Sequence, residues 1–93
     1  MNEEKAVVVC TELRGVFFGY TKDVDSVRIK LRAARNAYYW KVPAGTGVHA
    51  LASVGPLQGS KIGARADVQL RKVTAVFDCT PEAVQAWEAA TWA

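Results

Sequence analysis

Short hydrophobic runs broken by glycine or polar turns are the feature that most constrains the fold of this chain. The runs at 6–11 (Ala-Val-Val-Val-Cys-Thr) and 16–20 (Val-Phe-Phe-Gly-Tyr) are rich in β-branched and aromatic residues. The segment 12–15 between them ends in Gly15, a residue suited to positive φ. A polar turn at 22–26 then precedes 27–31, where apolar and basic residues alternate. These patterns predict a β-hairpin extended by a third antiparallel strand.

The middle of the chain gives more ambiguous signals. Within 33–42, the first residues favour a helical turn and Tyr38 onward favours a strand, so we predict a bend near Asn36 and a strand from Tyr38. Residues 48–54 fit either a short helix or a strand, and 57–67 is predicted to be an irregular loop. Residues 68–77 are predicted to form a central strand, with a bulge near 72–73.

The C-terminal segment carries the clearest local signal. Thr80 suits a helix N-cap, Pro81 suits the first helical position, and Glu82 complements the helix dipole. One stripe of the predicted helix is apolar, while Gln85 and Glu88 are expected to face away; the stripe consists of Ala83, Val84, Trp87, Ala90 and Thr91. We therefore expect residues 1–93 to form one α+β domain. Its predicted core is a curved antiparallel β-sheet or small open barrel of about five strands, closed by one C-terminal α-helix.

Composition argues against several classes of protein. Cys10, Cys79 and the single His49 are too few to form a zinc site, and no nucleophile signature surrounds them. We therefore expect no metal, no cofactor, no catalytic residues and no enzymatic activity. The acidic N-terminus does not resemble a signal peptide, and no run of apolar residues is long enough to span a membrane. The sequence thus predicts a cytoplasmic protein with reduced cysteines.

Residues 27–41 contain five of the twelve basic side chains, no acid, and three consecutive aromatic residues. In an extended strand the basic residues 28, 30 and 32 would project on one side, roughly 6.5–7 Å apart. Tyr38, Tyr39 and Trp40 cannot all face the core, so we expect Tyr38 and Trp40 inside and Tyr39 outside. The glycine-containing loop after residue 55 lacks Walker spacing but offers further cations. The predicted ligand-binding residues are Arg28, Lys30, Arg32, Arg35, Tyr39, Trp40, Lys61 and Arg65.

Several segments together carry a resemblance that covers nearly the whole chain: 11–19, 34–40, 51–56, 62–63 and 73–87. On these segments the chain resembles a family of small uncharacterised proteins, a domain of unknown function, encoded by tailed bacteriophages and prophages. The resemblance implies a phage context and the cytoplasm of a bacterial host. It attaches to no activity, so it assigns no functional residue.

These observations favour a non-enzymatic binding protein. The leading hypothesis is a homo-oligomeric anti-defence sponge that sequesters an anionic, nucleotide-like signalling molecule, because cations and aromatic faces suit phosphates and bases. The alternative is a virion accessory or an interaction module that inhibits a host protein, because Tyr, Trp and Arg also dominate protein interfaces. A second alternative is a protein that binds single-stranded nucleic acid, with an affinity that falls steeply as salt increases.

Overall fold

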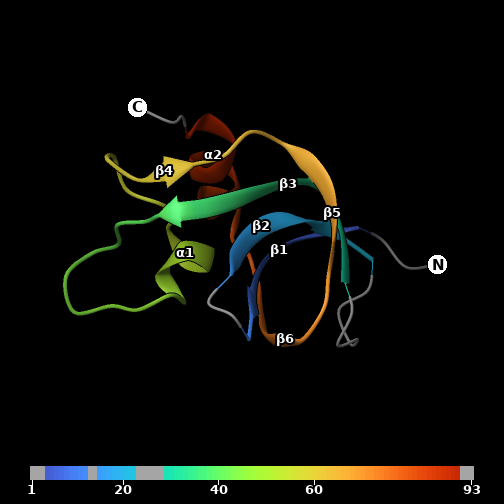
Figure 1. Cartoon of the computed structure of the whole chain (residues 1–93). Helices are drawn as coiled ribbons and strands as arrows, with labels where there is room; N and C mark the ends of the chain where they lie inside the picture. Colours follow the sequence, from blue (N-terminus) through green and yellow to red (C-terminus); the bar gives the residue numbers. More distant parts are fainter. Residues whose placement is uncertain (1–3, 13–14, 23–28, 91–93) are drawn as a thin grey trace.

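The computed structural model of the protein describes residues 4–12, 15–22 and 29–90 (Figure 1). Its elements follow one another along the chain as β1 (Lys5–Thr11), β2 (Val16–Thr21), β3 (Ile29–Tyr39), α1 (Ala50–Ser53), β4 (Lys61–Ile62), β5 (Ala66–Leu70), β6 (Val73–Asp78) and α2 (Pro81–Ala89). This is a mostly antiparallel sheet followed by a C-terminal helix, which confirms the α+β prediction at that level.

The sheet has the strand order β4-β3-β2-β1-β6, and β5 pairs with β3 outside this path. β1 and β2 form the predicted hairpin, in which the Thr11 N–H donates to the Gly15 carbonyl at 2.9 Å. The six strands do not close into a barrel, so of the two predicted architectures the curved sheet is the correct one.

β3 is one long strand, so the predicted bend near Asn36 with a new strand from Tyr38 is wrong. The irregularity lies earlier, at Ala33, which has a φ of 52° and interrupts the pairing with β5 between Leu31 and Ala34. The Ala33 N–H donates to the Asp67 side chain at 2.9 Å. A bulge of this kind inserts one residue, so Arg32 and Arg35 come to lie on the same face of the strand. Residues 27 and 28 of the predicted strand lie outside the described residues.

The segment 68–77, predicted to be one central strand, forms two strands separated by a corner. Its continuity and its central place were predicted wrongly, whereas the irregularity predicted near 72–73 is present. Lys72 has a φ of 55° at the corner, which redirects the chain from β5 to β6 (Figure 1). β5 then pairs with β3, whereas β6 pairs with β1 at the end of the strand order. The predicted loop at 57–67 also contains β4 and the start of β5, and the ambiguous segment 48–54 contains the short helix α1.

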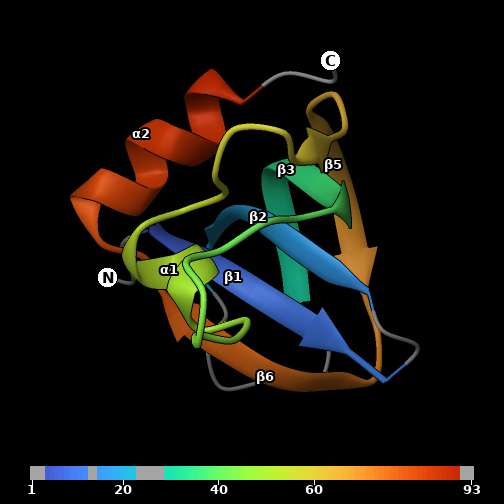
Figure 2. The same ribbon diagram turned by 90° about the vertical axis from the view of Figure 1, so that its left-hand side faces the viewer.

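Both faces of the sheet bury hydrophobic side chains. On one face, Val8 and Phe18 pack with Leu51 of α1 and Trp87 of α2, so that both helices lie against β1 and β2 (Figure 2). On the other face, a second buried cluster is enclosed by the curvature of the sheet and by the β5–β6 corner: Val7, Val9, Ile29, Leu31, Ala34 and Leu70. Consecutive residues of β1 therefore belong to different clusters, as the two-residue period of a strand requires.

The start of α2 agrees with the sequence prediction. The Thr80 hydroxyl accepts a hydrogen bond from the Ala83 N–H at 3.1 Å, Pro81 occupies the first turn, and Glu82 lies beside it. Ala83 and Trp87 are fully buried, while Gln85 is exposed. Glu88 does not simply face solvent, because its carboxylate accepts a hydrogen bond from the Tyr20 hydroxyl at 3.2 Å. Thr91, the last residue of the predicted stripe, lies outside the described residues.

Candidate binding surface

The basic residues predicted on β3 have different surroundings. Lys30 is exposed opposite Gln69 of β5. The Arg32 guanidinium forms a two-pronged contact with the Glu4 carboxylate, with the shortest separation at 2.7 Å, and lies 4.8 Å from the centre of the Tyr20 ring. The hydrogen bond to Arg32 holds the pKa of Glu4 below its usual value. Arg32 is therefore already paired with an acid, and Arg28 lies outside the described residues.

Arg35 is part of the core, with only 5% of its surface exposed. Its Nη1 donates to the Trp87 carbonyl at 2.6 Å, and its Nε donates to the Gly63 carbonyl at 2.8 Å. Burial lowers the pKa of the guanidinium from its usual value. Because the carbonyl end of a helix is its negative pole, a cation placed there stabilises α2.

Arg65 reaches the same end of α2 from the surface. Its Nη2 donates to the Glu88 carbonyl at 2.9 Å, and its Nε lies 3.3 Å from the Glu88 carboxylate. The two arginines thus hold the last turn of α2 against β3 and the segment after β4. The structure gives Arg35 and Arg65 partners within the fold and does not place them in a common surface site with Tyr39.

Three large hydrophobic side chains are strongly exposed among the described residues: Tyr38 (63%), Tyr39 (51%) and Leu57 (41%). The expectation that Tyr38 packs inside is wrong, whereas Tyr39 faces outward and Trp40 packs against the helix-side core as predicted. The pairing of β3 with β4 shifts between Ala37 and Tyr39. This irregularity breaks the simple alternation from which the direction of Tyr38 was predicted.

β4 and the preceding loop hold the end of β3 in place. Tyr39 pairs with Lys61, the Lys41 N–H donates to the Ser60 hydroxyl at 2.8 Å, and the Leu57 N–H donates to the Lys41 carbonyl at 2.9 Å. Ser60 is buried, so its hydroxyl supports the backbone and is not presented as an anion ligand. We refer to Tyr38, Tyr39, Lys41, Leu57 and Lys61 together as the tyrosine–lysine surface.

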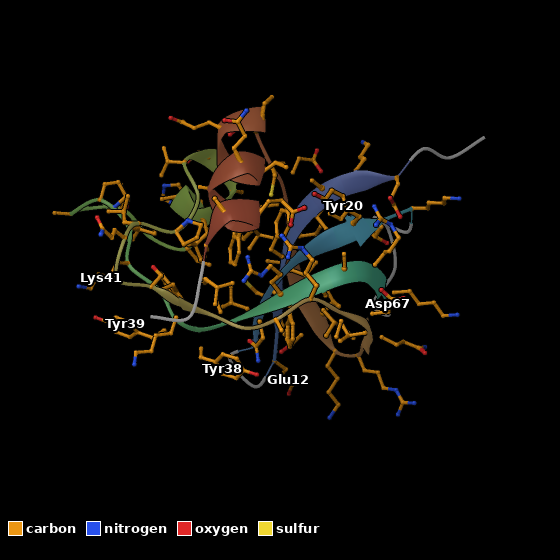
Figure 3. All side chains as sticks on the ribbon, turned by 90° about the horizontal axis from the view of Figure 1, so that it is seen from above. Glu12, Tyr20, Tyr38, Tyr39, Lys41 and Asp67 are labelled. Atoms are coloured by element: carbon orange, nitrogen blue, oxygen red, sulfur yellow. The ribbon has the colours of Figure 1, made fainter. Side chains whose placement is uncertain are left out.

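Two glycines allow side chains of this surface to lie against the backbone. A Cβ at Gly63 would be 2.8 Å from the Tyr38 ring, and a Cβ at Gly59 would be 3.1 Å from the Lys41 Nζ. Figure 3 shows Tyr38, Tyr39 and Lys41 along one margin of the molecule, pointing away from its centre. Gly59 and Gly63 therefore leave the space in which Lys41 and Tyr38 of this surface lie.

Two open hollows accompany this arrangement. A groove of about 290 Å³ runs between the 56–60 loop and Ala86, Ala89 and Ala90 of α2, and it shares Leu57 with the tyrosine–lysine surface. A second, shallower hollow of about 370 Å³ lies on β3 and β5 around Lys30, Arg32 and Asp67. Both are open to solvent, and neither brings together a nucleophile and a base. This geometry suits binding at a surface.

The two cysteines are free thiols within the described part of the chain. Burial raises the pKa of both, and for Cys79 the burial and the nearby Asp78 carboxylate raise it to about 12. A thiol of this kind is a poor nucleophile at neutral pH. Among the described residues no group of three or more His, Cys, Asp or Glu side chains could hold a metal ion. None of the described helices has the length and apolar character needed to cross a membrane.

Comparison with known proteins gives one result. The model of a family described as a domain of unknown function (DUF6948) matches residues 4–87. No curated protein and no solved structure matches the chain.

Proposed function

We propose that this chain, which belongs to the DUF6948 family of domains of unknown function, is a non-enzymatic protein that binds a nucleotide-type anion on the tyrosine–lysine surface. The observation that carries the proposal is the exposure of two adjacent tyrosines beside lysines on a paired strand end. Tyr39 lies directly opposite Lys61, so one aromatic ring and one cation are offered at the same point of the sheet.

This combination matches the two chemical parts of a nucleotide. An exposed tyrosine ring can stack on a base, an interaction that contributes about 1–3 kcal/mol per base. A lysine ammonium can approach a phosphate as a compact charge. The hydrogen bonds that hold Lys41 to Ser60 and Leu57 keep the strand end in place before the ligand arrives, which lowers the entropic cost of binding.

On this proposal, several of the ligand-binding residues predicted from the sequence do not contact the ligand. Arg32, Arg35 and Arg65 have acidic or carbonyl partners within the molecule, and Lys30 lies near the other end of β3. Trp40 packs beneath the surface against the core. We assign ligand contact to Tyr38, Tyr39, Lys41 and Lys61, because these four side chains are exposed and lie together where β3 pairs with β4.

The wider role that we propose is sequestration of a nucleotide signal in a bacterial cytoplasm by a phage-encoded, oligomeric anti-defence protein. Its support is the resemblance to phage proteins together with the open character of the surface. A ligand lying on such a surface would be only partly enclosed by one copy of the chain, so a second copy would be needed to cover it.

Titration calorimetry with a panel of cyclic and ADP-ribose-type nucleotides tests the proposal. At least one member should bind at micromolar protein, and Tyr39→Ala and Lys61→Ala should each weaken that binding by about tenfold or more. Lys30→Ala is the matched control for Lys61→Ala, since it removes an exposed lysine near the start of β3, away from the tyrosine–lysine surface. Absence of heat with every member would refute the proposal.

A second candidate function is binding of a protein partner, and the specific observation in its favour is Leu57. This side chain is 41% exposed and lines the apolar groove beside α2, which a phosphate ligand would not require. Exposed tyrosines and leucine together resemble the centre of a protein interface. A host protein or virion component that co-purifies with the wild-type chain and is lost with Leu57→Asp would favour this role. Binding to single strands that collapses with salt would instead favour the nucleic-acid alternative.

A further inference from the structure

The groove beside α2 adjoins the tyrosine–lysine surface. Leu57 and Gly59 line the groove, and Lys41 lies against both of them. The Leu57 N–H donates to the Lys41 carbonyl at 2.9 Å, and a Cβ at Gly59 would be 3.1 Å from the Lys41 Nζ. The Lys41 side chain is exposed, so its ammonium lies at the rim of the groove. A ligand with a negative group at Lys41 can therefore extend into the groove.

The walls of the groove are uncharged. Figure 2 shows the segment between α1 and β4 passing beside the C-terminal part of α2. Three alanines of the helix form one wall, and the segment contributes Pro56 and Leu57 to the other. Gln58 also lines the groove and is exposed, and its amide can both donate and accept hydrogen bonds. Apolar walls with a few polar groups are typical of small-molecule sites, and here they suit a flat, partly polar ring better than a phosphate.

The size of the groove limits what it can hold. Its volume is about 290 Å³. Small-molecule pockets range from about 300 to 1,000 Å³, so this groove lies at the lower end of that range. It therefore has room for one ring system of a ligand and not for the whole of a larger molecule.

The neighbouring features follow one another in a definite order. Tyr39 and Lys61 face each other across the β3–β4 pair, and Lys41 follows Tyr39 by two residues and meets the wall of the groove. An exposed ring, a pair of cations and an uncharged groove thus lie in succession. A mononucleotide offers one base and its phosphate, so it would leave either the ring or the groove without a partner. A dinucleotide offers a base at each end of a phosphate-containing link.

Given the proposed function, on which this inference rests, we propose that the ligand is a dinucleotide whose second base occupies the groove beside α2. The first base stacks on Tyr39, and the phosphate link lies at Lys41 and Lys61. The second base lies between Leu57 and the alanines of α2, with its polar edge toward the Gln58 amide. This arrangement accounts for the exposure of Leu57, which a phosphate alone leaves unexplained.

Titration calorimetry of the full chain compares ligands with one base and with two. The probes are linear and cyclic dinucleotides of adenine and guanine, each measured beside the 5′-mononucleotide of the same base. At least one dinucleotide should bind about tenfold or more tightly than its mononucleotide, because the second base adds a contact of its own.

A substitution that fills the groove tests where the second base lies. Ala89 lines the groove and is exposed, so Ala89→Leu narrows the groove without changing the core, and circular dichroism checks that the variant is folded. It should reduce the affinity for the dinucleotide to that for the mononucleotide and leave the mononucleotide unaffected. Ala66→Leu is the matched control, because it makes the same change at an exposed position of β5 outside the groove. Tyr39→Ala should weaken both ligands.

The outcomes separate this proposal from the proposed function. Equal affinities for mononucleotides and dinucleotides overturn the dinucleotide and leave nucleotide binding in place, as does a dinucleotide advantage that Ala89→Leu does not change. Absence of binding by every probe overturns both. A protein that co-purifies with the wild type and is lost with Ala89→Leu, while the dinucleotide affinity stays the same, makes that protein the occupant of the groove and overturns the proposal. An advantage that appears only in Trp92→Ala makes the C-terminus of the chain the occupant and also overturns it.

Discussion

Arg35 shows how a charged residue can belong to the core of this small protein. It is buried, and its guanidinium donates to carbonyls of two separate segments, Trp87 in α2 and Gly63 after β4. Its positive charge also lies at the negative end of α2. The residue therefore ties the sheet, the helix and the segment before β5 together through one planar group.

Replacement of Arg35 by Met should destabilise the fold by about 1–3 kcal/mol, because it leaves buried carbonyl oxygens without their donor. Urea denaturation followed by circular dichroism measures the change. Arg65→Met is the control, since Arg65 contacts the same helix end from an exposed position and should cost less than about 1 kcal/mol. Equal effects of the two variants would contradict the role assigned to Arg35.

The raised pKa of Cys79 predicts how the free energy of unfolding depends on pH. Burial raises its pKa from about 9 to about 12, so between these values the unfolded chain loses the thiol proton while the folded chain retains it. The unfolded state then binds fewer protons, and the free energy of unfolding must fall as pH rises above 9. Urea denaturation at pH 8, 9, 10 and 11 should show this fall, and Cys79→Val should make it shallower. An unchanged slope in the variant would show that other groups cause the fall.

Among the structural elements, α2 depends most on local chemistry. The Thr80 hydroxyl accepts from the Ala83 N–H and also donates to the Ser53 carbonyl at 2.6 Å, so it joins α2 to the end of α1. Thr80→Ala should lower the free energy of unfolding by about 1–2 kcal/mol, measured by thermal denaturation. Thr80→Ser keeps the hydroxyl and should recover most of the loss. If Ser behaves like Ala, the cap is not the source of the stability.

The sequence allowed α2 and the β1–β2 hairpin to be predicted because their signals are local. Thr80, Pro81 and Gly15 act on residues within one turn. The bulge at Ala33 has no such signature, and at Lys72 the interrupted alternation indicated a bulge but not a corner. An alanine or lysine with positive φ is held there by the surrounding pairing. Those two positions decide which strands pair and on which face Arg35 lies.

The candidate site was predictable to a similar extent and for the same reason. The prediction that some of the aromatic residues at 38–40 would be exposed needed only the alternation of a strand, and Tyr39 is exposed. The partners of Arg32, Arg35 and Arg65 could not be predicted. Glu4 and Glu88 are far from these arginines in the sequence, and only the fold brings them within reach.

At the scale of the whole molecule, the two hydrophobic clusters share the same strands. Val8 packs under the helices, whereas Val7 and Val9 pack on the opposite face. The ring of Trp87 stacks on Phe18 with their centres 5.2 Å apart and their planes 9° from parallel, which connects α2 to the middle of β2. Because β1 contributes side chains to both clusters, the unfolding of either cluster would expose one face of β1 to solvent.

We therefore predict that the protein unfolds in one cooperative step. Trp40→Phe/Trp92→Phe leaves Trp87 as the remaining tryptophan, so fluorescence reports the helix-side core while circular dichroism reports the sheet. The two urea transitions should coincide, because a strand that lines both clusters couples their unfolding. A variant that also carries Leu31→Ala, in the opposite cluster, should shift both transitions by about 2–5 kcal/mol in free energy. If this substitution moved the circular dichroism transition and left the Trp87 transition in place, the two clusters would be independent folding units.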